Sequence, residues 1–265
     1  MLLAIDVGNT NTVFGVYEGT QLVHRFRLAT DPERTGDEYA VLLRALLVAE
    51  GIEPARIDAI VLGSVVPPLN DVVLRMCKRL FSLSPLVIGP GVKTGMPILV
   101  DNPREVGADR IVNAIAGYER HRRDAGGPFG LIIVDFGTAT TFDVVSPRGE
   151  YLGGAIAPGM LIATEALFTH AAKLPRVDLN VPLNAIGKST VTSMQSGILY
   201  GYAGLVEGLV ARIRAELDYA PRVIATGGLG AIVATLASSI ERVDEDLTLE
   251  GLRIVYERNQ GGGGR

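Results

Sequence analysis

One pattern occurs twice in this sequence, and it limits the possible folds more than any other feature. The first copy, residues 2–17, has an apolar run, a polar turn and a second apolar run: LLAIDVGNTNTVFGVY. The second copy, residues 131–145, reads LIIVDFGTATTFDVV. Short apolar runs on both sides of a glycine-containing turn predict two buried strands joined in a hairpin. We therefore expect the chain to be built from two similar halves.

The turns carry the polar residues of the pattern. In an ungapped alignment Asp6 matches Asp135, Gly8 matches Gly137, Thr12 matches Thr141 and Val16 matches Val145. Each turn places a carboxylate at the end of a strand beside hydroxyl and backbone N–H groups, a set that suits a metal-bound polyphosphate. One such turn alone is equally compatible with an ordinary Asn-Gly hairpin. Two similar domains facing each other would bring both turns to one cleft, where they could hold a nucleotide from two sides.

The order of the predicted elements indicates how each half folds. Three strands in the first half are followed by a helix, a strand, a second helix and a fifth strand, and the second half again begins with a three-stranded meander. Thr35 and Glu38 form a capping box that begins the first helix. This order is that of an RNase H-like domain, so we predict an α/β fold with mixed sheets flanked by helices. We place the domains at residues 1–118 and 119–259, followed by a flexible tail, residues 260–265.

Length and composition exclude several protein classes. The 265 residues suffice for two domains, and the mean hydropathy of +0.29 is typical of a globular chain. A net charge of −4 argues against a nucleic-acid partner. A single cysteine, and no apolar run approaching about 18 residues, predict a cytoplasmic protein that does not interact with membranes. Cys77 is predicted to be a core residue, because no histidine that could activate it is evident nearby.

Residues 107–110 read Gly-Ala-Asp-Arg, in a helix that we expect to begin at Asn102 and Pro103. Gly107 would destabilise the interior of such a helix, and a ligand that approaches the backbone would explain its presence. The alternative interpretation is an ordinary surface pair of charges, Asp109 and Arg110, at the start of a helix.

Glycines mark two further segments. A long helix predicted over residues 189–217 has four of them on one face: Gly197, Gly201, Gly204 and Gly208. Close packing within the chain and close packing against a second copy across a two-fold axis both explain such a face. A glycine-rich turn at residues 226–230 leads from a strand into a helix, where phosphates can bind, although such turns are common.

Four of these segments together resemble type III pantothenate kinases: residues 6–10, 107–110, 135–138 and 226–228. The resemblance covers residues 1 to about 259, and its most specific parts are the Gly-Ala-Asp-Arg and Asp-Phe-Gly-Thr blocks. It implies ATP-dependent phosphorylation of pantothenate to 4'-phosphopantothenate, the first step of coenzyme A biosynthesis. It also implies a homodimer and two RNase H-like domains of the acetate kinase, hexokinase, Hsp70 and actin superfamily.

The resemblance also assigns roles to residues. ATP would be bound by Thr138 and by the first turn, namely Asp6, Val7, Gly8, Asn9, Thr10, Asn11, Thr12 and Val13. Metal ions would be bound by two carboxylates, Mg2+ by Asp6 and K+ or NH4+ by Asp135. Pantothenate would contact Gly107, Ala108, Asp109, Arg110 and Thr190. Asp109 would be the catalytic base, and the guanidinium of Arg110 would pair with the carboxylate of pantothenate.

One departure from the family and one other class of function remain. Many relatives carry a tyrosine that contacts pantothenate where this chain has Val100, which cannot donate that hydrogen bond. The same fold also serves ATP-binding regulatory or assembly proteins that lack small-molecule kinase activity. The short chain and the joint presence of Asp6, Asp109 and Asp135 favour the kinase.

Overall fold

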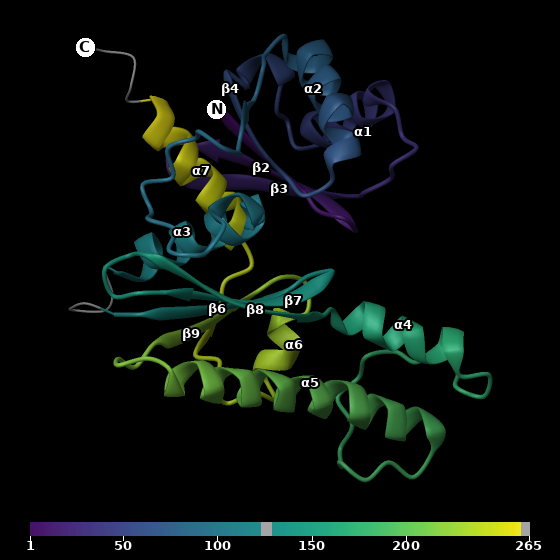
Figure 1. The fold of residues 1–265 in the computed structure, drawn as a ribbon. Coiled ribbons are helices and arrows are strands. Elements are labelled where there is room, and N and C mark those ends of the chain that lie inside the picture. Colours follow the sequence, from purple (N-terminus) through teal and green to yellow (C-terminus); the bar gives the residue numbers. More distant parts are fainter. Residues whose placement is uncertain (123–128, 261–265) are drawn as a thin grey trace. The chain divides into compact units, whose positions relative to one another are not determined.

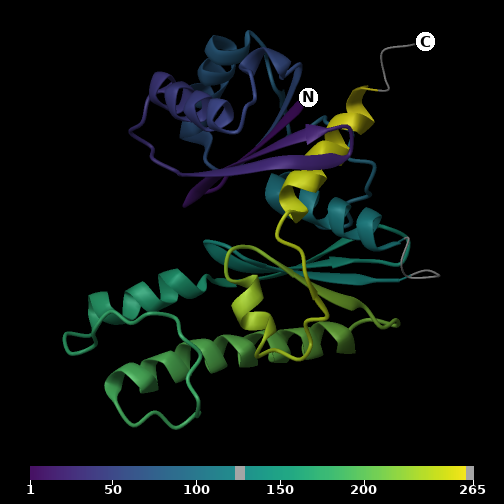
Figure 2. The ribbon, with the colours of Figure 1, turned by 180° about the vertical axis from the view of Figure 1, so that it is seen from behind.

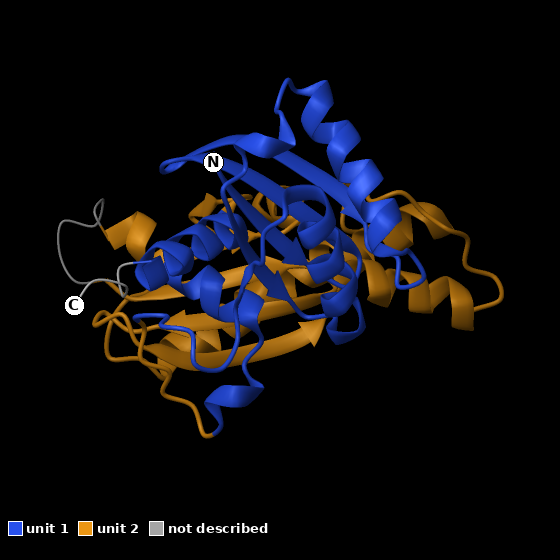
Figure 3. Cartoon of the chain, turned by 90° about the horizontal axis from the view of Figure 1, so that it is seen from above, with its two compact units in different colours: residues 1–95, 102–116, 247–265 blue, residues 96–101, 117–246 orange. Residues whose placement is uncertain are grey.

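The computed structural model describes residues 1–122 and 129–260, which form two compact units, shown in two colours in Figure 3. Unit 1 contains residues 1–95, 102–116 and 247–260, and unit 2 contains residues 96–101, 117–122 and 129–246. The division falls inside helix α3 (Ala108–Arg122). The last helix, α7 (Leu247–Gln260), which the sequence places in the second domain, groups with unit 1. Except for Gln260, the predicted tail lies outside the described residues.

Unit 1 contains a mixed sheet with the strand order β3-β2-β1-β4-β5. The strands are β1 (Leu2–Val7), β2 (Asn11–Glu18), β3 (Gln21–Ala29), β4 (Ala59–Ser64) and β5 (Leu86–Val87). β1 runs antiparallel to β2 and parallel to β4. Besides α7 and part of α3, the unit contains α1 (Gly36–Ala49), α2 (Pro67–Phe81) and two short 3-10 helices, η1 (Pro54–Arg56) and η2 (Pro103–Glu105).

Alternation along β1 separates two faces of this sheet. Leu3, Ile5 and Val7 belong to the apolar core that includes residues of α1 and α2. The other face is covered by α7 (Figure 1), where the glycines Gly15 and Gly63 leave no room for a Cβ beside leucines of that helix. Asp6 alternates with the core residues of β1 and pairs with Gly63. Its side chain therefore lies on the face that α7 covers.

Local sequence signals in unit 1 are confirmed. The capping box predicted at α1 is present: the Thr35 hydroxyl accepts a hydrogen bond from the Glu38 N–H, and the Glu38 side chain accepts one from the Thr35 N–H. The prolines at 67 and 68 begin α2, as expected from their missing N–H groups. Cys77 is buried in the core, and burial raises the pKa of its thiol to about 12, so the thiolate is absent at neutral pH.

Unit 2 contains a second mixed sheet with the order β10-β9-β6-β7-β8. Its strands are β6 (Leu131–Phe136), β7 (Ala139–Val145), β8 (Tyr151–Pro158), β9 (Arg222–Thr226) and β10 (Arg242–Val243). The helices that follow β8 and β9 are α4 (Met160–His170), α5 (Thr190–Ala215) and α6 (Gly230–Ala234). No helix in the described part of the chain is long and apolar enough to cross a membrane. The predicted α/β fold with two mixed sheets is confirmed.

The faces of the second sheet are also distinct. Ile132, Val134 and Phe136 of β6 pack into a core with residues of α5 and α6, and both helices lie on this side of the sheet in Figures 1 and 2. Asp135 alternates with these residues, so its side chain lies on the opposite face. That face also carries Ile133, which lies against Gly117 of α3.

The two hairpins differ by one residue, and this corrects the ungapped alignment. The Gly8 N–H donates to the Asn11 carbonyl at 3.0 Å, whereas the Gly137 N–H donates to the Ala139 carbonyl, also at 3.0 Å. Beyond the turn, Val7 pairs with Thr12, but Phe136 pairs with Thr140. Thr12 therefore corresponds to Thr140 rather than Thr141, and both threonines are buried. The turn of unit 1 is one residue longer than the turn of unit 2.

Candidate active site

The turn between β1 and β2 contains most of the residues predicted to bind ATP. Its tip, Asn9 and Thr10, is exposed, whereas Asp6, Gly8, Asn11 and Val13 are half-buried. The remaining two, Val7 and Thr12, are buried, with exposed fractions of 1% each. Because these two side chains are buried, the surface that the turn offers to a ligand comes from its other residues.

The Gly-Ala-Asp-Arg block has a different local structure from the predicted one. The 3-10 helix η2 ends at Glu105, and α3 begins only at Ala108, so Gly107 precedes the helix and does not interrupt it. A Cβ on Gly107 would lie 2.5 Å from Oδ1 of Asp109. The absence of a side chain at 107 thus gives space to the Asp109 carboxylate, and no ligand is needed to explain this glycine. Asp109 Oδ1 also accepts a hydrogen bond from the Arg110 N–H at 2.8 Å.

Helix α7 holds the beginning of α3 in place. The Thr248 hydroxyl of α7 donates to the buried side chain of Asn113 in α3 at 2.8 Å. Gly251 lies against the backbone of Val112 so closely that a Cβ would not fit. Since α7 covers the face of the sheet that carries Asp6, α3 brings Asp109 to the same side of the sheet as Asp6. Unit 1 therefore combines the polar turn and the candidate base on one side.

Asp135 lies among glycines at the end of β6. A Cβ on Gly227, whose φ is +86°, would lie 2.5 Å from Asp135 Oδ1, and a Cβ on Gly137 would lie 3.7 Å from the same oxygen. The exposed residue Thr138 follows in the β6–β7 turn. A carboxylate oxygen is the type of donor that alkali and alkaline-earth cations prefer, and Gly227 has no side chain that would displace it.

Thr190 and Val100 also belong to unit 2. Thr190 is the exposed first residue of α5 and lines an open groove of about 960 Å³ between α4 and α5, together with Thr164, Lys188 and Gly197. Val100 lies in a segment that pairs with β8, where a methyl group is 3.5 Å from the position of a Cβ on Gly153. The structure thus assigns Val100 and Thr190 to unit 2, and residues 107–110 to unit 1.

The carboxylates fit metal ions that are shared with a ligand. No group of three or more His, Cys, Asp or Glu side chains that could hold a metal occurs among the described residues. Mg2+ is commonly bound through one or two carboxylates plus substrate phosphates and water, and Asp6 beside the polar turn suits that mode. Asp135 in its glycine-lined site suits a larger cation with oxygen ligands.

One residue of this region was missed in the sequence. Thr30, the residue after β3, contacts the Asp6–Val13 turn through its backbone and its hydroxyl. Its position at the predicted end of the third strand is the only signal that the sequence offered, and the partner turn is some twenty residues away in the chain.

Comparison with known proteins identifies the family. A family model described as type III pantothenate kinase matches residues 2–212. A type III pantothenate kinase of Myxococcus xanthus is 58% identical over 259 residues, covering 98% of this chain and 99% of that protein. The type III pantothenate kinase of Geobacter sulfurreducens is 58% identical over 260 residues, covering 98% of this chain and 100% of that protein.

Solved structures agree on the fold. A conserved Campylobacter jejuni protein described as a candidate Baf family transcriptional activator has a TM-score of 0.61 at 21% identity, with 98% of this chain and 99% of that chain covered. A ROK hexokinase of Thermus thermophilus has a TM-score of 0.51 at 16% identity, with 98% and 99% covered. These likenesses show that the chain shares the fold of both proteins, and the sequence matches decide the family. The chain belongs to the type III pantothenate kinase family.

Proposed function

We propose that this protein transfers the γ-phosphoryl group of ATP to the primary hydroxyl of pantothenate, the first step of coenzyme A biosynthesis. The observation that carries this proposal is the 58% identity to type III pantothenate kinases over nearly the whole chain. We place the activity in the cytoplasm, where ATP is available.

The direct test is ADP release by the purified protein with Mg2+ and ATP, with and without pantothenate. A rate that rises with pantothenate, together with a phosphorylated product, supports the proposal. An ATP hydrolysis rate that is the same with and without pantothenate would overturn it. That result would favour an ATP-binding regulatory or assembly protein.

The chemistry that the residues must perform is mainly positioning. Phosphoryl transfer through a loose transition state needs alignment and charge neutralisation more than covalent participation. Asp6 and the exposed tip of its turn bind the phosphates of ATP. Asp6 would hold Mg2+ there, and that ion would supply positive charge beside the phosphates. Asp109 orients the pantothenate hydroxyl and accepts its proton late in the reaction. Arg110 pairs with the pantothenate carboxylate through a planar guanidinium.

We expect the activity to depend on a monovalent cation bound at Asp135. Such a cation would supply positive charge near the phosphates without requiring a fixed coordination geometry. Replacing K+ by Na+ or by a bulky organic cation should lower kcat about tenfold. The lost interaction between the ion and the carboxylate would raise the activation free energy by about 1.4 kcal/mol, which corresponds to that factor. The measurement is the initial rate in chloride salts at constant ionic strength.

The matched variant is Asp135→Ala, checked by its melting temperature for an intact fold. It should be slow in every salt and insensitive to K+. Equal wild-type rates in all salts, or a K+ response that survives in Asp135→Ala, would contradict the assignment of the cation to this carboxylate.

We also propose that the protein is a homodimer that uses α5. Apart from the backbone of α5 itself, no described atom lies within 4 Å of a Cβ added to Gly197, Gly201 or Gly204, and the nearest atom to one on Gly208 belongs to Arg212 of the same helix. Packing within the described chain therefore does not account for the glycine face. Large apolar side chains are exposed nearby on α4, on the loop after it and on α5: Leu161, Ile162, Leu167, Val181, Leu183, Ile186 and Val191. Large apolar side chains exposed on neighbouring segments of the chain support an interface in this region.

Gly201→Leu tests this interface. Because the site is open in the single chain and leucine favours helix more than glycine, the monomer should fold normally. In a close helix pair the added side chain costs about 1–3 kcal/mol, so the dimer dissociation constant should rise about tenfold to a hundredfold. Sedimentation velocity over a concentration series measures this shift, with Gly201→Ala as the smaller step. An unaltered dimer in Gly201→Leu would exclude this face of α5.

A further inference from the structure

Thr30 makes three hydrogen bonds to the turn that carries Asp6. Its backbone N–H donates to the Thr10 carbonyl at 3.0 Å, and its hydroxyl donates to the Gly8 carbonyl at 2.7 Å. The hydroxyl oxygen is also 2.9 Å from the hydroxyl oxygen of Thr12. Thr30 thus forms hydrogen bonds to the residues that precede and follow Asn9 at the exposed tip of the turn.

The donor and the acceptor of each hydroxyl hydrogen bond follow from the number of protons available. A threonine hydroxyl has one proton, and the Thr30 proton goes to the Gly8 carbonyl, which can only accept. The Thr12 hydroxyl must therefore donate to Thr30. In this chain of donors, Thr12 to Thr30 to Gly8, the buried Thr12 proton is used within the protein, so Thr12 acts on the shape of the turn.

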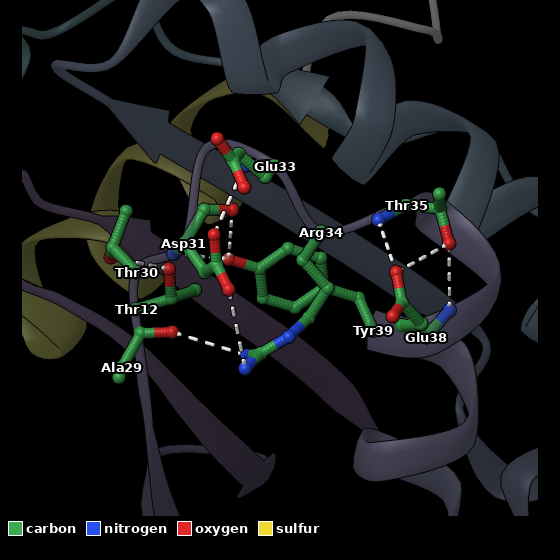
Figure 4. Close-up of polar contacts among 9 residues, drawn as sticks. All are labelled: Thr12, Ala29, Thr30, Asp31, Glu33, Arg34, Thr35, Glu38 and Tyr39. Atoms are coloured by element: carbon green, nitrogen blue, oxygen red, sulfur yellow. Dashed lines mark hydrogen bonds and ion pairs between the residues drawn. The ribbon is translucent and has the colours of Figure 1, made fainter.

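The segment that follows Thr30 is itself fixed (Figure 4). The Asp31 N–H donates to the hydroxyl of Tyr39, whose side chain is buried in α1. The Arg34 guanidinium donates to the Ala29 carbonyl at 3.3 Å, is 3.7 Å from the Asp31 carboxylate and lies over the Tyr39 ring. Asp31 is therefore held by α1, and Ala29 is part of β3, so Thr30 lies between two residues that the fold holds in place.

The hairpin of unit 2 serves as an internal comparison. Asn11 pairs with Ala29 at the end of β3, and Ala139 pairs with Pro158 at the end of β8. The residue that corresponds to Thr30 is therefore Gly159. It lies against the carbonyls of Gly137 and Thr138 so closely that a Cβ would not fit. The shorter turn is held by direct backbone packing, whereas the longer turn of unit 1 is held by a hydroxyl group.

We propose that Thr30 is a positioning residue for the nucleotide: it holds the Gly8–Thr10 backbone in the conformation that receives the phosphates of ATP. The inference rests on the proposed function, because it assumes that this turn binds ATP. Without the hydroxyl, the Gly8 carbonyl loses its donor and the longer turn can adopt other conformations, which weakens nucleotide binding. Pantothenate binding, assigned to residues 107–110, does not depend on this hydroxyl.

The test compares Thr30→Val with Thr30→Ser. Valine keeps the size and the branching of threonine but removes the hydroxyl, and serine keeps the hydroxyl. The control is Thr235→Val, which removes a threonine hydroxyl that donates to the Ile232 carbonyl, also at 2.7 Å, at the end of α6. For each variant we would measure the melting temperature, kcat, KM for ATP and for pantothenate, and the Kd of a non-hydrolysable ATP analogue with Mg2+.

Thr30→Val should raise KM for ATP and the Kd of the analogue about tenfold, the scale of one hydrogen bond in a binding equilibrium. KM for pantothenate should stay unchanged, Thr30→Ser should recover most of the loss, and Thr235→Val should resemble the wild type. Unchanged analogue binding by Thr30→Val overturns the inference, as does an equal loss for both substrates, which indicates a general structural role. A wild-type protein that does not bind the analogue would instead overturn the proposed function.

If Thr30→Val does not fold, Tyr39→Phe replaces it. This variant removes the hydroxyl that fixes Asp31 beside Thr30 and keeps the buried ring. It should raise KM for ATP about threefold, because it loosens the support and leaves the Thr30 hydroxyl present. An unchanged KM for ATP in Tyr39→Phe would likewise overturn the inference.

Discussion

Asp109→Asn should lower kcat by about two to four orders of magnitude, the range for a positioned general base. The amide has the size of the carboxylate but cannot accept the proton of the pantothenate hydroxyl. The melting temperature should stay near that of the wild type, since Asp109 is half-exposed at the start of α3. The measurement is kcat and both KM values, with Asp71→Asn, an exposed acid on α2, as the control.

Near wild-type turnover in Asp109→Asn would exclude this residue as the base. A loss confined to KM for pantothenate, with kcat preserved, would make it a binding residue only. A similar loss in Asp71→Asn would show that the effect comes from the removal of any negative charge.

Gly107→Ala should lower kcat about a hundredfold with little change in stability. The new methyl group would lie 2.5 Å from Asp109 Oδ1, so the group that must move is the end of a flexible side chain. The carboxylate therefore shifts while the backbone stays in place, and a misplacement of about 1 Å in a reacting group costs rates on this scale. Kinetics and melting temperature are measured for Gly107→Ala and for Gly89→Ala, where an added Cβ meets nothing within 4 Å.

The double variant separates displacement from other effects. If Gly107→Ala acts through Asp109, the variant that carries both changes should be no slower than Asp109→Asn alone. Multiplicative losses would mean that the glycine contributes by a route of its own, such as backbone contact with the substrate.

The sequence was informative where a signal is local. The apolar runs on both sides of the turns predicted all four strands of the two hairpins, and the pair Thr35 and Glu38 predicted the start of α1. The alignment of the two copies was wrong by one residue after the turns, because the turn of unit 1 is one residue longer than the turn of unit 2. Both turns are rich in threonine, so an alignment without a gap gave no sign of the difference.

Other features of the site depend on contacts between distant segments. Thr30 is adjacent to the Asp6 turn only because β3 pairs with β2. Gly107 looked like a costly helix residue, since the sequence does not reveal that η2 ends before it and that α3 begins after it. The placement of α7 in unit 1 could not be predicted either, because the sequence of a short amphipathic helix does not indicate which sheet the helix will cover.

The return of α7 to unit 1 has a consequence for synthesis of the chain. Gly15 and Gly63 form a surface shaped for Leu249 and Leu252, so the first sheet keeps one apolar face uncovered until those residues have left the ribosome. Domains generally fold in the order of synthesis, from the amino terminus onwards. Here unit 1 is begun before unit 2 and completed after it, because α7 follows all of unit 2 in the chain.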